Sequence, residues 1–160
     1  ADSVAISGHK FIGSPIPSGV IITKKSNRDR IAKGVSYIGS FDTTITGSRN
    51  GHSPLFLWYA LKRMGVEGLK ERFQNSLEVA SYCEKRLNEI GIPAWRNPNA
   101  ITIVFPKVHD SIISKWQLAT QETISHIICM PNVTKEQIDN LILDIQNCEE
   151  VVENEYEFSF

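Results

Sequence analysis

The order of apolar and polar residues predicts a strand-rich beginning for this chain. β-Prone runs at residues 4–6 and 19–23 flank a polar turn, which predicts two strands joined by that turn. Mixed charges at residues 26–34 predict a short helix or a surface turn. The Gly-, Ser- and Thr-rich residues 36–53 predict a long loop.

Two helical patterns follow this loop. Residues 55–61, preceded by Pro54, are apolar on nearly all sides, which predicts a helix buried between other elements. Over residues 69–90 apolar side chains recur every three or four positions, which predicts an amphipathic helix that Gly91 ends. Its apolar positions are Leu69, Phe73, Leu77, Ala80, Cys83, Leu87 and Ile90.

The last third of the chain predicts a small sheet covered by a helix. Residues 100–105 and 125–130 read as two strands, each followed by a proline, and we expect them to share this sheet. Thr134 and Gln137 have the spacing of a capping box at the start of a helix. The apolar stripe of that helix consists of Ile138, Leu141, Ile142 and Ile145.

These patterns predict three parts: residues 1–66, an α+β module at 67–149, and an acidic tail at 150–160 that frays. The first strands are too few to bury their own apolar residues, so we expect them to join a larger sheet. The chain opens without an initiator Met and enters an apolar segment at once. It therefore reads as a piece of a longer protein, in which any targeting signal would lie upstream.

Charge and composition narrow the classes of partner. The 17 basic and 18 acidic residues leave a net charge of -1, which argues against binding to nucleic acid or to an anionic membrane. No apolar run reaches the roughly 20 residues that a membrane helix needs. The three cysteines are an odd number without C-x-x-C spacing, so we expect reduced thiols rather than disulfides or a zinc site. We therefore expect a soluble, cytoplasmic protein that acts on a small molecule.

A first cluster of reactive side chains stands at the end of the first predicted strand. Ser7, His9 and Lys10 bring a hydroxyl, an imidazole and an amine to a strand-to-turn junction, where active sites are often found. The alternative is a polar turn with an ordinary surface lysine. Residues 11–17 carry no charge, so we expect the Lys10 amine to be desolvated, which favours the neutral, nucleophilic form.

A second cluster occupies residues 46–53. Gly47 leaves backbone N–H groups open, and Ser48, Arg49 and Asn50 add donors just before a predicted helix, which is typical of an anion site. A hydrogen-bonded loop that caps the helix explains the same residues equally well. His52, His109 and His126 lack the spacing of metal ligands and are interpreted as structural or surface residues.

Together the two clusters resemble a known family. The segment SGHKFIGSPIPSG, followed by TGSRNGHSPLFLWYAL, is similar to the group II pyridoxal-phosphate (PLP) dependent amino-acid decarboxylases, in the branch of bacterial histidine decarboxylases and plant serine decarboxylases. The resemblance continues through residues 116–120, His126 and Met130-Pro131, and only the tail departs from it.

The resemblance implies an α/β protein of fold type I, the aspartate-aminotransferase-like architecture of PLP-dependent transferases. Residues 1–66 would then be the end of the large PLP-binding domain with its connecting helix, and residues 67–149 the small C-terminal α+β domain. A homodimer or higher homo-oligomer with shared active sites is also implied.

The resemblance further implies roles for single residues. Lys10 would carry pyridoxal 5'-phosphate, and Ser7 and His9 would bind its phosphate, while Gly47 and Ser48 would reach the phosphate held in the other subunit. Tyr37, in a stretch that is a mobile loop in related enzymes, would protonate the substrate α-carbon; the alternative for Tyr37 is a packed loop aromatic. Arg49 would contact phosphate or substrate, or brace the loop.

The implied activity is decarboxylation of an L-amino acid, with histidine favoured over serine as substrate. The residues that bind the rest of the cofactor would lie upstream, so we expect this piece alone to be inactive. Two alternatives stay open: another fold type I lyase similar to sphingosine-phosphate lyase, and a non-catalytic paralogue that only dimerises.

Overall fold

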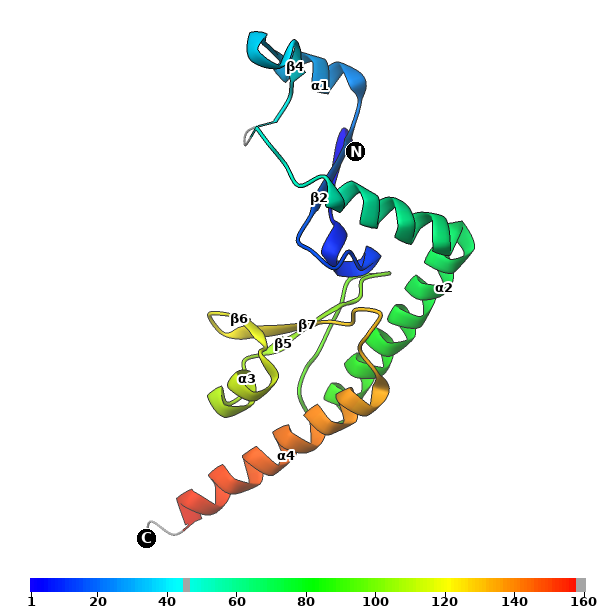
Figure 1. Ribbon diagram of the computed structural model, residues 1–160. Helices are drawn as coiled ribbons and strands as arrows, with labels where there is room; N and C mark the ends of the chain where they lie inside the picture. The colour runs from blue at the N-terminus through cyan, green and yellow to red at the C-terminus, as the bar shows by residue number, and fades with distance from the viewer. Residues whose placement is uncertain (45–46, 158–160) are drawn as a thin grey trace. The chain divides into compact units, whose positions relative to one another are not determined.

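The computed structural model describes residues 1–44 and 47–157 (Figure 1). Contacts divide the chain into two units, Ala1–Glu67 and Gly68–Phe160, which are described in turn. This division falls one residue beyond the boundary predicted at 66/67. Equating the two units with the large and small domains of a fold type I enzyme stays a prediction.

The first unit begins with an antiparallel hairpin. Strand β1 (Ser3–Ser7) pairs with β2 (Gly19–Thr23), so that Ser3 lies opposite Thr23 and Ser7 opposite Gly19. The π-helical turn η1 (Gly8–Ile12) follows β1 directly. Both predicted strands and the polar turn between them are confirmed.

The rest of the first unit is more regular than predicted. The charged segment forms helix α1 (Lys25–Ile31), as the pattern allowed. A second hairpin follows: β3 (Lys33–Val35) and β4 (Ser40–Asp42), joined by the 3-10 turn η2 (Ser36–Ile38). The prediction of a loop throughout residues 36–53 was therefore wrong at its start. Gly39, with φ +64°, adopts the left-handed conformation that lets the chain reverse within so few residues.

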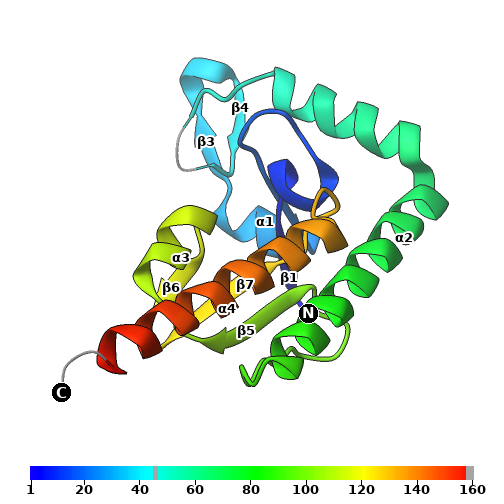
Figure 2. The ribbon, with the colours of Figure 1, turned by 90° about the horizontal axis from the view of Figure 1, so that it is seen from below.

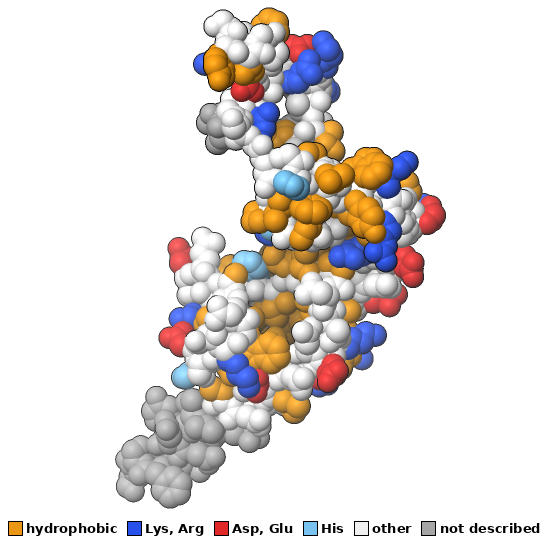
Figure 3. All heavy atoms as spheres, viewed as in Figure 1, with side chains coloured by type: hydrophobic (Ala, Val, Ile, Leu, Met, Phe, Trp, Pro, Cys, Tyr) orange, Lys and Arg blue, Asp and Glu red, His pale blue; other side chains and the backbone are white. Residues whose placement is uncertain are grey.

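Helix α2 (His52–Glu89) joins the two predicted helices, and it is interrupted at Gly65, where φ is +62° and ψ is -170°. Only glycine adopts this backbone conformation readily, which explains where the helical geometry breaks. The first half of α2 was predicted to be buried, and this was wrong for the described chain. Leu55, Trp58, Tyr59 and Leu61 are exposed there, and Figure 3 shows apolar side chains gathered over this half of the helix.

The second unit is a three-stranded antiparallel sheet with helices (Figure 2). Its strands are β5 (Thr102–Pro106), β6 (Ala119–Gln121) and β7 (Ile124–Ile128), in the order β5-β7-β6. The two predicted strands do pair, with Phe105 opposite Ser125. The pattern gave no sign of β6 or of helix α3 (Asp110–Trp116), which are only three and seven residues long.

The second half of α2 and the final helix α4 (Lys135–Glu157) supply most of the core of this unit. Their buried side chains come from the predicted apolar stripes and meet one face of β5. The core consists of Ala80, Cys83, Leu87, Ile92, Ala94, Ile103, Phe105, Ile112, Cys129, Ile138, Leu141, Ile142 and Ile145. The predicted packing of the last helix on the sheet is thus confirmed.

The start of α4 agrees with the prediction from the sequence, and its end lies further along the chain than the predicted one. Its capping box is formed: the Thr134 N–H donates to Gln137 Oε1 at 2.9 Å, and the Gln137 N–H donates to Thr134 Oγ1 at 3.2 Å. At the other end the helix continues to Glu157, beyond the start of the predicted tail at residue 150, and the fraying of that tail stays a prediction. Residues 158–160 lie outside the described residues.

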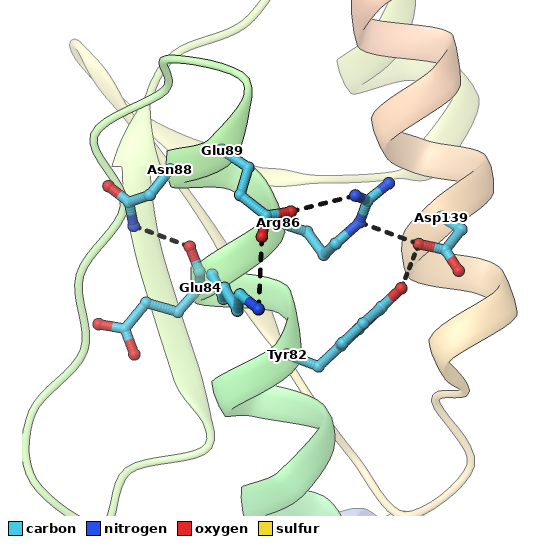
Figure 4. Close-up of polar contacts among 7 residues, drawn as sticks. Tyr82, Glu84, Arg86, Asn88, Glu89 and Asp139 are labelled. Carbon is cyan, nitrogen blue, oxygen red and sulfur yellow. Dashed lines mark hydrogen bonds and ion pairs between the residues drawn. The ribbon is translucent and has the colours of Figure 1, made fainter.

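A polar network ties α2 to α4 on the surface of the core (Figure 4). The Tyr82 hydroxyl donates to Asp139 at 2.6 Å, and Arg86 Nε donates to the same carboxylate oxygen at 3.2 Å, while Arg86 also contacts Glu89 at 3.1 Å. The hydrogen bond to Asp139 raises the pKa of Tyr82, because it stabilises the neutral phenol. The network therefore links Tyr82 and Arg86 of α2 to Asp139 of α4.

Candidate active site

The turn after β1 is held in place by backbone contacts around Gly8. Its N–H donates to the Ser18 carbonyl at 2.9 Å, and its own carbonyl accepts from the Ser14 N–H at 2.9 Å. Gly8 is buried, and a Cβ at this position would lie 2.5 Å from Ser18 Oγ and 2.6 Å from Leu57 Cδ2. Both distances are shorter than real contacts, so a side chain at this position would force Ser18, Leu57 or the turn to move.

The same backbone orients the imidazole of His9. Its Nδ1 lies 3.2 Å from both the N–H and the carbonyl oxygen of Ser18. In the tautomer in which Nδ1 accepts from the Ser18 N–H, the proton of the neutral imidazole is on Nε2. Nε2–H is therefore left as an outward donor on an exposed side chain.

Lys10 stands in the middle of this turn, where φ is -95° and ψ is -107°. Its side chain is exposed, so the desolvation expected from the uncharged residues 11–17 is not provided by the described chain, and that prediction was wrong for it. Ser7, at the end of β1, is half-buried. The structure thus brings Ser7, His9 and Lys10 onto one strand-to-turn junction, as the sequence suggested.

Ser18 was not anticipated as part of this site. Its backbone holds both Gly8 and His9, and its Oγ is buried with no hydrogen-bond partner among the described residues. The Pro17-Ser18-Gly19 sequence reads as a simple strand entry, so only the pairing of β1 with β2 reveals this role.

The second cluster, residues 46–53, has features both of a loop that caps the helix and of an anion site. Asn50 caps α2, because its Oδ1 accepts from the His52 N–H at 2.7 Å, as a capping loop requires. Gly47 (φ +67°) and Ser48 are exposed, and nothing lies within 4 Å of the place where a Cβ on Gly47 would stand. They are thus accessible to a ligand. Thr46, the first residue of the cluster, lies outside the described residues.

Arg49 acts on the loop electrostatically. Thr44 donates to Asp42 through its hydroxyl at 2.8 Å and its N–H at 2.9 Å, and these hydrogen bonds lower the pKa of Asp42; the nearby Arg49 charge adds to the shift. The choice between a bracing role and a ligand-binding role for Arg49 stays open.

Tyr37 lies on the turn η2 and is 95% exposed. No described residue packs against it to any extent, and both the acid role and the packed alternative for Tyr37 stay predictions. Among the described residues, no hydrogen bond or ion pair joins Lys10 to Tyr37, Gly47 or Ser48. The three parts of the predicted site consequently stand on separate segments of the first unit.

The described part of the chain offers no group of three His, Cys, Asp or Glu side chains suited to a metal ion. A search of the described helices also finds none that is both long and apolar enough to cross a bilayer. The three cysteines are free thiols; Cys83 and Cys129 are buried and Cys148 is half-buried.

Comparison with known proteins finds similarity to named decarboxylases. No family model matches it. It is 50% identical over 147 residues to a histidine decarboxylase from Mesorhizobium japonicum, which covers 92% of this chain and 40% of the relative. It is 49% identical over 144 residues to serine decarboxylase 3 of rice, covering 89% of the chain and 32% of the relative.

The chain is a homologue of the histidine and serine decarboxylases. It spans about a third to two fifths of the length of these curated relatives. Among solved structures, L-methionine decarboxylase from Streptomyces sp. 590 superposes with a TM-score of 0.75 at 34% identity, over 89% of this chain and 31% of that one.

A more distant structure confirms the architecture. The sphingosine-1-phosphate lyase of Burkholderia pseudomallei has a TM-score of 0.72 at 19% identity, over 92% of this chain and 37% of that one. The decarboxylase homologue thus has the fold type I architecture that the resemblance implied.

Proposed function

We propose that this chain is part of a PLP-dependent amino-acid decarboxylase, a carboxy-lyase, in which Lys10 carries pyridoxal 5'-phosphate. The observation that supports this most strongly is the identity of 46–50% to histidine and serine decarboxylases over about nine tenths of the chain. The activity belongs to the complete enzyme, of which this chain supplies one part.

The residues on the β1–η1 junction fit such a cofactor. Lys10 offers an exposed amine, and His9 offers an Nε2–H donor whose direction is fixed by the Ser18 backbone. Hydroxyl groups stand beside them on Ser7 and, unpartnered, on Ser18. An amine for the carbonyl and several neutral donors for a phosphate are the groups that PLP requires.

Each of these residues has a distinct task in the proposal. PLP, when bound, supplies the electron sink for loss of CO2 from the substrate α-carbon. Lys10 holds the cofactor through its amine, and His9 and Ser7 donate hydrogen bonds to the phosphate. Gly47 and Ser48, which are exposed, contact the phosphate bound in a second subunit.

Tyr37 delivers a proton to the substrate α-carbon in this proposal. Its phenol is almost fully exposed on a three-residue turn, so it is free to enter a neighbouring active site. A correctly placed acid favours the amine product over side reactions, because the carbon is protonated before it reacts otherwise. Tyr37→Phe should then slow amine formation and raise the share of by-products, whereas unchanged product formation would exclude the acid role.

A homodimer is the oligomeric state that this proposal requires. Large apolar side chains of the first unit are exposed in the described chain, among them Ile21, Ile31, Phe41 and Trp58. Such surface normally lies in an interface. Free cysteines in the chain support a reducing, cytoplasmic location.

Histidine is proposed as the substrate, with serine next. The two relatives differ by only one per cent in identity, so product analysis must decide. The complete enzyme, reconstituted with PLP, would be incubated with a panel of L-amino acids, and amines would be identified by mass spectrometry, with Lys10→Ala as the control.

Histamine that disappears in the control supports the histidine proposal, and ethanolamine would assign serine instead. A cleaved aldehyde product would favour a lyase like the structural neighbour of 19% identity. Absence of any product would favour the non-catalytic alternative.

A further inference from the structure

The second unit contains a cavity of about 570 Å³ on elements that carry none of the residues assigned to the decarboxylase site. It lies among the segment after α2, the connection from β5 to α3, helix α3, and α4. Its walls are mainly apolar, with Ile92, Pro93, Val108, Ile112 and Ile145 among the lining residues. A volume of this size is in the range of small-molecule sites.

One wall of the cavity carries a chain of three reactive groups. Cys148 and His109 both line it, and Ser111 stands between them: Ser111 Oγ lies 3.6 Å from Cys148 Sγ and 2.8 Å from His109 Nδ1. These residues come from α4, the N-cap of α3, and the first turn of α3. The other two cysteines are buried in the core and do not line this cavity.

The direction of these hydrogen bonds is set by the backbone. The Ser111 N–H donates to His109 Nδ1 at 3.3 Å, so this nitrogen is an acceptor. Ser111 therefore donates its hydroxyl proton to Nδ1, and its oxygen is left to accept from the Cys148 thiol. The thiol proton has a path through Ser111 to the imidazole, an arrangement that activates a cysteine for nucleophilic attack.

We propose that this cavity binds small apolar electrophiles of the α,β-unsaturated carbonyl class and that Cys148 Sγ adds to them covalently. The sulfur forms a bond to the β-carbon while the carbon–carbon π bond breaks. The thiol proton passes through Ser111 to His109, the α-carbon takes up a proton from water, and the imidazolium returns its proton to the hydroxide that is left. The addition is redox-neutral and needs no other reactant.

The electrostatics of the cavity favour an uncharged, apolar ligand over an anion. Lys107 also lines it, but its ammonium is paired with Asp110 at 2.8 Å. A thiol is a soft, polarizable nucleophile suited to conjugated carbon electrophiles. The cavity therefore favours uncharged α,β-unsaturated carbonyl compounds, because its walls are apolar, its lysine is paired and its thiol is activated.

The test compares two maleimides, which are α,β-unsaturated carbonyl compounds, on the full 160-residue chain. N-cyclohexylmaleimide is apolar, and 6-maleimidohexanoic acid carries a carboxylate. Labelling of each cysteine would be followed by digestion and mass spectrometry, with N-acetylcysteine as the reference for intrinsic reactivity. We expect Cys148 to prefer the apolar probe by about tenfold more than N-acetylcysteine does, as apolar burial of a ring predicts.

The relay is tested separately with Ser111→Ala and Ser111→Thr. Loss of the hydroxyl should slow labelling of Cys148 by about tenfold or more, and threonine, which restores a hydroxyl, should recover most of the rate. The preference for the apolar probe should survive in both variants.

Three results would overturn the proposal. The same probe preference in Cys148 and N-acetylcysteine would mean that the cavity does not bind the ligand. Labelling of Ser111→Ala as fast as that of the unchanged chain would exclude the relay. Labelling of Cys83 and Cys129, which are buried in the core, as fast as that of Cys148 would mean that the cavity walls do not exist in solution.

Discussion

Replacing Gly8 by alanine tests how the first unit positions Lys10. The new Cβ would lie 2.5 Å from Ser18 Oγ and 2.6 Å from Leu57 Cδ2, so at least one neighbour or the turn itself must move. Inserting a methyl group into a packed site generally costs about 1–3 kcal/mol. Since Ser18 also orients His9, the displacement reaches the proposed phosphate ligand directly.

If this strain is relieved only by moving the turn, the free energy of PLP binding becomes less favourable by the same amount. A loss of about 1–3 kcal/mol corresponds to a fall in PLP affinity of about 5- to 150-fold. Titration of the apoenzyme with PLP, followed by absorbance, would measure it. Gly19→Ala is the matched control on the same hairpin, because nothing lies within 4 Å of its added Cβ. An affinity of Gly8→Ala for PLP within about twofold of that of the unchanged enzyme would show that the turn does not have to move.

Three further changes test the second unit. Ile142 is fully buried, so Ile142→Ala should lower the free energy of unfolding by about 2–5 kcal/mol, as measured by urea titration. Leu143 is 54% exposed, so the control Leu143→Ala should lower it by less than about 1 kcal/mol. Equal losses in the two variants would contradict the described core. Thr134→Ala removes the capping box and should cost about 1 kcal/mol in the same assay, and no loss would mean that the cap is not formed in solution. The hydrogen bond from Lys115 lowers the pKa of Asp144, so its carboxylate stabilises the fold at neutral pH and loses this effect as the pH falls below about 4. Asp144→Asn should flatten the fall of the unfolding free energy in acid, and an unchanged pH dependence would exclude this contribution.

The sequence predicted best those elements whose apolar faces are covered within the chain. The stripe on α4 and the one on the second half of α2 meet each other and the sheet, so their periodicity corresponds directly to burial. The capping box at Thr134 is equally local, because its two hydrogen bonds span three residues. Local pattern and final packing agree in these cases.

The predictions that were wrong concern residues that no other part of the described chain covers, or elements too short to leave a periodic pattern. The residues around Trp58 are apolar and were expected to be buried, yet no described element covers them. Lys10 was likewise expected to be buried and is exposed, because uncharged neighbours in the sequence do not by themselves bury an amine. The hairpin around Gly39 and the short strand β6 depend on pairing between three-residue strands, which leave no periodic signal.

The candidate site was predictable as a set of residue types but not as an arrangement. Ser7, His9 and Lys10 are adjacent in sequence, so their junction could be read directly. The role of Ser18 depends on strand pairing across nine residues, and no motif marks it. Asn50, expected as one donor among several, serves as the cap of α2.

The attachment of PLP to Lys10 can be tested by fixing the cofactor chemically on the complete enzyme. PLP-loaded protein would be reduced with borohydride and digested, and the labelled peptide would be sequenced by mass spectrometry. We expect a phosphopyridoxyl group on Lys10 and none in Lys10→Ala. Labelling of a different lysine, or no stable label on the loaded enzyme, would contradict the attachment of PLP to Lys10.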